Sequence, residues 1–256
     1  MNILIVNDDS VDSPFLELLI EQIPAEHNCH IVVPAEEQSW KGKAMTRFGE
    51  LAEKTETING RTVHCIYGTP ADCANIGIYH NDFGLPDCVI SGINIGHNAG
   101  VAYIFSSGTV GAAIEANIAG IPALSLSQLL PNELFDEWIN NRSLTDSSMD
   151  YFRKQLDQVF PKVWEKFQPE IQAKNPITWN VNFPGKLAAD WELKSARCGL
   201  SFYGSCFKKT DDTFKHDAPK PQEDQGEDSD VQIILSGHVS VTKLDMRSFG
   251  QDKIDF

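Results

Sequence analysis

Two neighbouring carboxylates, Asp8 and Asp9, follow the apolar run 2–6 after a single asparagine. Like charges a few ångströms apart repel each other, and removing carboxylates from water costs free energy unless a positive charge compensates them. The pair therefore indicates a cation-binding site at the end of a buried strand. The alternative is that one carboxylate caps the following helix while the other is exposed to solvent.

Oxygen donors suited to the same cation occur in two later polar segments. They are the hydroxyl of Ser39 and the side-chain amide of Asn94 or Asn98. An all-oxygen set without Cys or paired His suits Mg²⁺, Mn²⁺ or Ca²⁺ rather than structural zinc. The sequence thus predicts a divalent cation held by these side chains and the two aspartates, with coordination positions left for water.

The run Ser107, Gly108 and Thr109 is a candidate anion site because it precedes an expected helix over 109–119. Free backbone amides and the helix dipole at such an N-terminus bind phosphate. The alternative is that Ser107 or Thr109 only caps the helix. The chain contains neither GxGxxG nor a GxxxxGKS or GxxxxGKT motif, so the usual nucleotide-cofactor and P-loop signatures are absent.

Strands and helices alternate along the first 127 residues. Strand-like runs occupy 2–6, 30–34, 62–67, 87–91 and 121–127, and helical spacing occupies 15–23, 71–79 and 109–119. This alternation predicts an α/β, three-layer Rossmann-like fold with a mostly parallel, doubly wound sheet. Because ligands of such sheets bind beyond the carboxyl ends of the strands, we expect the polar segments to converge there.

The next part of the chain extends this body. Residues 149–167 have the spacing of an amphipathic helix, which Pro161 should kink or break. Residues 177–184 read as one more strand. We therefore expect an α/β catalytic body over 1–185.

The character of the chain changes after residue 185. Residues 194–210 and 231–244 have the composition of β segments, and the acidic stretch 211–230 between them has almost no apolar side chains. Such a stretch is typical of a solvated, mobile loop. We therefore expect a β-rich extension over 186–256 that contains an acidic loop at 211–230.

Composition and charge limit the classes of function. A net charge of −15 argues against a protein that grips nucleic acid through a broad basic face. The six cysteines include no CxxC pair, so reduced thiols are expected. No apolar run approaches the roughly 20 residues that span a bilayer, and no secretory signal is recognisable, so we expect a cytoplasmic protein without a membrane partner.

Seven motifs, taken in order, carry a family resemblance. They are ILIVNDDS, PAEEQS, GTPADC, SGINIGHN, SGTVGAAIE, GIPALSLS and NVNFP, with ARCG and GHVSVT as looser matches further on. Together they resemble the SurE family of survival proteins. The resemblance implies a metal-dependent 5′/3′-nucleotidase that hydrolyses nucleoside monophosphates to nucleoside and phosphate. It also implies a homodimer or homotetramer, with the extension 186–256 as the oligomerisation element.

The resemblance further implies roles for individual residues. One divalent cation would be bound by Asp8, Asp9, Ser39 and Asn94, and the phosphate by Asn98, Ser107, Gly108 and Thr109. Either aspartate would accept a proton from the attacking water. The chain departs from the family pattern at Ser10 and Trp40, where glycine is usual, and in the segment 101–106. Trp40 is also a candidate lip of the pocket.

Three other interpretations are weighed against this one. A SurE-like protein that binds metal and nucleotide without useful catalysis fits the altered flanks. ILIVNDDS also resembles the opening of receiver domains in two-component signalling. Such a domain needs a phosphorylated Asp at the end of a strand and a Lys after a later strand, but Asp87 begins its strand and residues 123–128 contain no Lys. Haloacid-dehalogenase phosphatases need a DxD motif rather than two adjacent aspartates.

Overall fold

The structure is a computed structural model that describes residues 1–217 and 221–252. Its strands are β1 (Asn2–Val6), β2 (Asn28–Pro34), β3 (Glu53–Ile58), β4 (Arg61–Ile66), β5 (Cys88–Ile95), β6 (Ala123–Gln128), β7 (Thr178–Phe183), β8 (Leu193–Ala196), β9 (Phe207–Thr210), β10 (Thr213–His216) and β11 (Val239–Leu244). Its helices are α1 (Pro14–Gln22), α2 (Pro70–Tyr79), α3 (Val101–Ser106), α4 (Gly108–Ile118), α5 (Asn132–Asn141), α6 (Asp146–Gln172), α7 (Asp230–Leu235) and the 3₁₀ turn η1 (Met246–Ser248). None of the helices in these ranges is long and apolar enough to cross a membrane.

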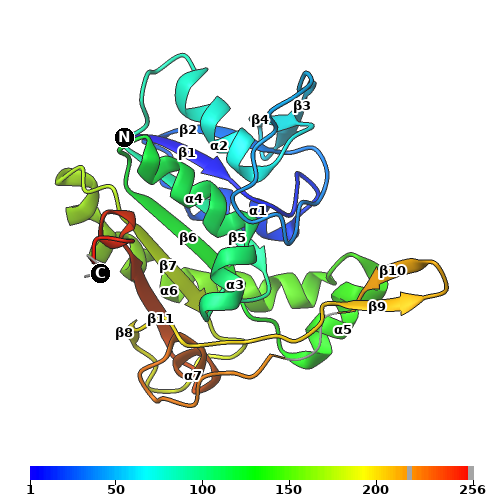
Figure 1. The fold of residues 1–256 in the computed structure, drawn as a ribbon. Coiled ribbons are helices and arrows are strands. Elements are labelled where there is room, and N and C mark those ends of the chain that lie inside the picture. The colour runs from blue at the N-terminus through cyan, green and yellow to red at the C-terminus, as the bar shows by residue number, and fades with distance from the viewer. Residues whose placement is uncertain (218–220, 253–256) are drawn as a thin grey trace.

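Nine of the described strands form one sheet, in the order β3-β4-β2-β1-β5-β6-β7-β11-β8. β1 pairs in parallel with both β2 and β5, and β6 and β7 continue the parallel run (Figure 1). After β1 the chain adds β2, β4 and β3 on one side of β1, and it then crosses to the other side of β1 to form β5. The space beyond β1 and β5 is therefore a topological switch point, where ligands bind in sheets of this kind. The predicted α/β fold is confirmed.

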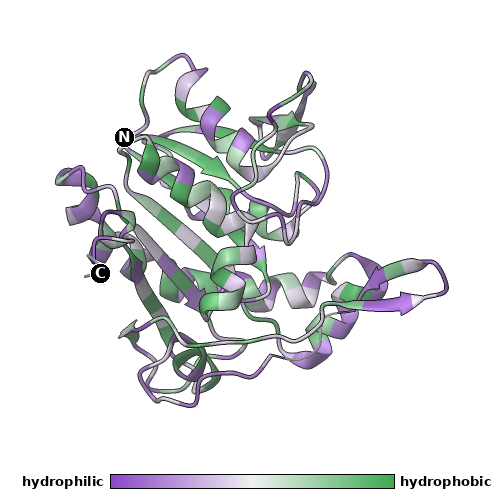
Figure 2. Cartoon of the chain, viewed as in Figure 1, coloured by the Kyte–Doolittle hydropathy of each residue, from purple (hydrophilic) through white to green (hydrophobic). Residues whose placement is uncertain are grey.

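Helices cover both faces of the sheet. On one face α1 packs against α6, where Phe15 meets Phe152 edge to face with 5.0 Å between ring centroids. On the other face the small side chains of Ala112 and Ala116 let α4 lie close to the strands. Because both faces are covered, residues 3–6 are wholly buried, and most of β1 has the green of hydrophobic residues in Figure 2.

We expected Pro161 to kink or break this helix. α6 runs without interruption from Asp146 to Gln172, so the break is wrong. The proline lacks the N–H that would donate to the carbonyl four residues earlier. Its neighbours Phe160, Val163 and Trp164 are buried in the core, and this tertiary packing keeps the helix continuous.

The chain after residue 185 adds strands to the same sheet. β11 pairs antiparallel with β7, and β8 pairs parallel with β11. The expectation of a strand throughout 231–244 is wrong in its first part, because α7 buries Val231, Ile233 and Ile234 there. A short apolar run does not distinguish a buried helix from a strand, so the sequence pattern was ambiguous at this point.

The acidic stretch 211–230 is solvent-exposed over 211–217, as expected, but it contains strand β10 and the first residue of α7 where a loop without regular structure was expected. Residues 218–220 lie outside the described part. β9 and β10 pair as an antiparallel hairpin. Asp230 is fully buried and accepts the backbone N–H groups of Gly100 and Gly199 at 2.8 and 3.0 Å. The stretch therefore ends in a contact that joins the extension to the loop after β5.

Candidate active site

The turn after β1 places Asp8 and Asp9 at the switch point. Asp8 is 2% exposed, and its Oδ1 accepts a hydrogen bond from the Thr109 hydroxyl at 2.5 Å. Oδ2 of Asp9 accepts the backbone N–H of Ile95 at 2.9 Å. The first carboxylate is thus fixed by α4 and the second by the end of β5.

The start of α4 reaches Asp8 because Gly108 has no side chain. A Cβ at position 108 would lie only 2.9 Å from the Cβ of Asp8, closer than real contacts allow. The positive end of the helix dipole is therefore brought against a carboxylate, which it stabilises.

Burial controls the protonation of both carboxyl groups. Desolvation raises the pKa of Asp8 to about 6, although hydrogen bonds from Thr109 oppose the shift. Desolvation, and then the nearby charge of Asp8, raise the pKa of Asp9 well above its usual value. The pair resists carrying two negative charges unless a cation lies beside it, so these residues fit a metal ion electrostatically.

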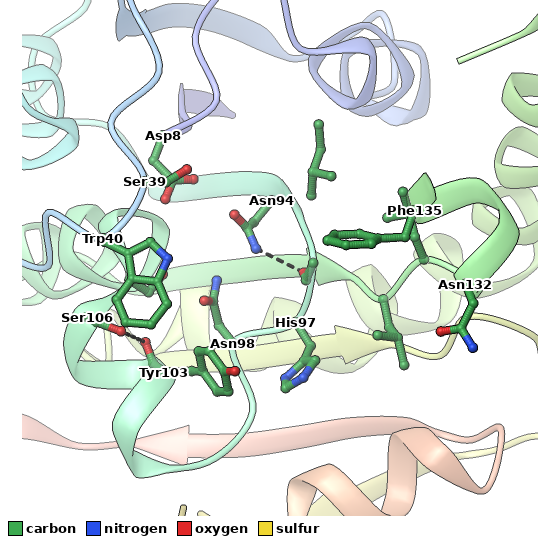
Figure 3. A pocket seen from close by; sticks show the side chains of 15 residues that line it. Asp8, Ser39, Trp40, Asn94, His97, Asn98, Tyr103, Ser106, Asn132 and Phe135 are labelled. Atoms are coloured by element: carbon green, nitrogen blue, oxygen red, sulfur yellow. Dashed lines mark hydrogen bonds between the residues drawn. The ribbon is translucent and has the colours of Figure 1, made fainter. Parts of the chain in front are cut away.

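Ser39 and Asn94 line the same cavity as Asp8, with a volume of about 400 Å³ (Figure 3). The amide nitrogen of Asn94 donates to the carbonyl of Gly96 at 2.9 Å, which leaves the amide oxygen on the side of Asp8. The Ser39 hydroxyl donates to Oε1 of Glu37 at 2.8 Å, so its own lone pairs stay free to bind a cation.

Three of the four predicted metal ligands, Asp8, Ser39 and Asn94, therefore line one cavity. Asp9 adjoins Asp8 but is not among the residues that line the cavity. In the ranges that the structure describes, no three His, Cys, Asp or Glu side chains gather as a metal-binding group. A cation beside the two aspartates would therefore need the neutral oxygens of Ser39 and Asn94, a donor set that suits Mg²⁺ or Mn²⁺.

The predicted phosphate-binding residues divide into two pairs. Asn98 and Ser107 line the cavity, whereas Gly108 and Thr109 lie behind Asp8. The Ser107 hydroxyl accepts a backbone N–H of the first turn and caps α4, as the capping interpretation predicts. The Thr109 side chain supports the carboxylate rather than facing the cavity.

The loop that carries Ser39 is fixed against α3 and α4. The N–H of Gly42 donates to the carbonyl of Ser106 at 2.9 Å, and a Cβ on Gly111 would collide with the Gly42 carbonyl. Lys43 forms a 2.6 Å ion pair with Glu115 of α4. The glycines allow backbone and helix to touch, which brings a distant loop to the cavity.

Most of the apolar wall of the cavity comes from residues that were not predicted from the sequence. Tyr103 of α3 and Phe135 of α5 line it, and neither helix was predicted. Trp40, the candidate lip, lines it as well. The segment 132–141 is amphipathic, so its helical spacing could have predicted α5 from the sequence.

Ser10 and Trp40 have left-handed backbone conformations, with φ of +71° and +64°. These are the positions where the family resemblance leads to an expectation of glycine. A side chain in this region clashes with its own backbone, at a cost of about 1–2 kcal/mol per residue. The two departures therefore place local strain directly beside Asp9 and Ser39.

Replacing Ser10 by glycine should stabilise the protein. Glycine adopts φ of +71° without strain, so we expect the free energy of unfolding in urea to rise by about 1 kcal/mol. Ser10→Ala is the matched control, because it keeps the strain and loses the 3.3 Å contact between the serine hydroxyl and the N–H of Asp12. An equal stability of the two variants would contradict this explanation.

His97 lines the cavity against Tyr103, and desolvation lowers its pKa to about 4. The folded protein keeps the imidazole neutral between about pH 6.5 and 4, where the unfolded chain binds a proton, so stability falls as the pH falls through this window. We expect the wild-type protein to lose up to about 3 kcal/mol more than His97→Asn between pH 7 and 4. Urea unfolding at each pH measures this difference, and equal losses would rule out a neutral buried imidazole.

The sequence of this chain matches a protein family and several curated proteins. The family model described as survival protein SurE matches residues 3–205. Two curated relatives are named 5′-nucleotidase SurE. The one from Methanococcoides burtonii is 30% identical over 95% of this chain and 93% of its own length, and the one from Pseudothermotoga lettingae is 31% identical over 95% and 88%.

The fold is also similar to that of a solved structure from the same family. The crystal structure of the SurE protein from Aquifex aeolicus superposes with a TM-score of 0.64 at 26% identity. The match covers 98% of this chain and 95% of that protein. Sequence and fold thus agree over nearly the whole length, and the chain belongs to the SurE family.

Proposed function

We propose that this protein is a nucleotidase, which hydrolyses nucleoside monophosphates to nucleoside and phosphate with one divalent cation per subunit. The observation that carries the proposal is the buried pair Asp8 and Asp9, adjoined by the neutral oxygens of Ser39 and Asn94. The relatives named 5′-nucleotidase SurE support the same activity. Hydrolysis of 3′-nucleotides is a second part of the proposal and follows from the family resemblance.

The residues that would hold the cation are Asp8, Asp9, Ser39 and Asn94. When bound, a divalent ion such as Mg²⁺ or Mn²⁺ offsets the charge of the phosphate and makes a bound water more acidic. Asp8 or Asp9 would accept a proton from the attacking water. Their hydrogen bonds to Thr109 and Ile95 hold both carboxylates in place for this step.

The phosphate would lie in the cavity on the open side of Asp8. Asn98 and Ser107 line that part of the cavity, whereas Gly108 and Thr109 contact Asp8 from behind and would act on the phosphate through this carboxylate. Asn98 is itself held by hydrogen bonds to side chains of β6 and β7. Donors fixed in this way stabilise the charge on the equatorial oxygens without reorganisation.

Binding of metal and nucleotide without useful catalysis is the second candidate function. One observation favours it: Ser10 and Trp40 place side chains on left-handed backbone next to Asp9 and Ser39. A shift of about 1 Å in a catalytic group costs about 100-fold in rate. Turnover measurements separate this candidate from the nucleotidase.

We also propose that the extension 186–256 mediates association into a homodimer or homotetramer. The hairpin of β9 and β10 supports this, because Phe207 and Phe214 are 57% and 68% exposed and the hairpin projects from the body (Figure 1). Light scattering on the pure protein should give twice or four times the monomer mass. Phe207→Ser with Phe214→Ser should shift the mass toward the monomer, and a monomeric wild-type protein would contradict the proposal.

Replacing Asp9 by asparagine should abolish metal-dependent hydrolysis and leave the fold intact. We expect kcat/KM for 5′-AMP with Mn²⁺ or Mg²⁺ to fall at least about 100-fold, because a charged ligand is lost. The cation should also raise the Tm of the wild-type protein, but not that of Asp9→Asn. Asp12→Asn, which alters an exposed aspartate nearby, is the control and should keep both properties.

The same assay uses 5′-AMP, 3′-AMP and p-nitrophenyl phosphate with and without EDTA. A metal-dependent rise in Tm without turnover of any of the three would favour the binding protein. Hydrolysis that persists in EDTA or in Asp9→Asn would contradict the proposed site.

A further inference from the structure

An aromatic cluster forms the wall of the cavity next to Ser39. Trp40 lines the cavity and is 42% exposed. Its indole contacts the rings of Tyr103, Tyr203 and His216, with centroid distances of 6.0, 5.6 and 4.9 Å and interplanar angles of 66°, 60° and 66°. None of these rings is stacked parallel on the indole. The contacts orient the indole and leave part of its surface open to the cavity.

Trp40 keeps this position against the preference of its own backbone. Its φ of +64° lies in the region that favours glycine. The loop is nevertheless held on both sides of it, since the N–H of Gln38 donates to the Asp8 carbonyl at 2.8 Å and that of Gly42 donates to the Ser106 carbonyl at 2.9 Å. The indole is therefore a fixed part of the cavity wall.

We propose that Trp40 is the stacking platform for the base of the nucleoside monophosphate, an inference that rests on the nucleotidase function proposed above. Trp40 follows Ser39 directly in the chain, and both lie with Asp8 around one opening (Figure 3). A base stacked on the indole has its phosphate end next to the carboxylates. Every base has a π face, so an aromatic platform of this kind accepts different bases.

The opposite wall of the cavity is less suited to a base. Phe135 lies there, across Asn94 from Trp40 in Figure 3, and is 46% exposed. It belongs to α5, which packs against the core through Leu134 and Trp138, while Phe135 itself is an exposed side chain. Phenylalanine also offers a smaller aromatic surface than tryptophan. The base is therefore assigned to Trp40.

The platform connects the hairpin to substrate binding. His216 lies in β10 and makes the shortest of the three ring contacts with Trp40. His216 is a positioning residue, because it acts on the base through the indole. None of the described residues of the extension lines the cavity, so the extension contributes to the site through Trp40.

The test compares two substrates that differ in the base. The measured quantity is kcat/KM for 5′-AMP divided by kcat/KM for ribose 5-phosphate, which carries the same phosphate and sugar. In Trp40→Gly, whose backbone suits glycine, we expect this ratio to fall about 5- to 150-fold. Trp40→Phe should retain most of the ratio. Tyr79→Ala removes an exposed aromatic ring outside the cavity and is the matched control.

An unchanged ratio in Trp40→Gly would overturn the platform, as would a larger fall in Phe135→Ala than in Trp40→Gly. In both cases continued hydrolysis would leave the nucleotidase function standing. Calorimetric binding of adenosine, which carries the base without the phosphate, to the metal-free protein is a second readout. Weaker binding by Trp40→Gly supports the platform even if the protein hydrolyses nothing. Equal affinity of the two proteins, or no binding by the wild-type protein, overturns it.

Discussion

The burial of Asp8 at the end of β1 is the constraint on which the rest of the site depends. A carboxylate without water needs donors around it, and here they come from Thr109 and the start of α4. That approach requires glycine at position 108 and a helix that lies close to the sheet, which Ala112 and Ala116 allow. The close packing of α4 against the sheet is therefore also what supplies the hydrogen-bond donors to the Asp8 carboxylate. Any change that lifts the helix also weakens the compensation of the carboxylate.

The elements around the site were predictable because each is specified locally. The helix expected over 15–23 is α1 at Pro14–Gln22, and the strand expected over 177–184 is β7 at Thr178–Phe183. Apolar runs with helical or strand periods carry this information without knowledge of distant contacts. The convergence of polar turns followed from the parallel sheet, since successive strand ends meet at one edge. Asp8, Ser39 and Asn94 do line one cavity.

The rest depends on contacts between residues far apart in the chain. Asp230 looked like one of many acids in a polar stretch, and nothing near it in sequence indicates that it is buried against backbone amides. The role of Trp40 in the cavity wall likewise depends on Tyr203 and His216, which belong to the extension. The break predicted at Pro161 failed for the same reason, because tertiary packing outweighs the loss of one helical hydrogen bond at the proline. The sequence gives the type of each of these residues but not the distant residues that they contact.

The bond between Asp230 and Gly100 also bears on how the protein is made. The two residues lie 130 positions apart, and the bond fixes the N-terminus of α3 just beyond Asn98. During synthesis, the strands from β1 to β7 leave the ribosome before the acid that holds this turn does. A nascent chain therefore completes most of its sheet while the loop after β5 still lacks its anchor, and distant contacts of this kind form slowly. The turn that follows Asn98 can be anchored only after residue 230 has been synthesised.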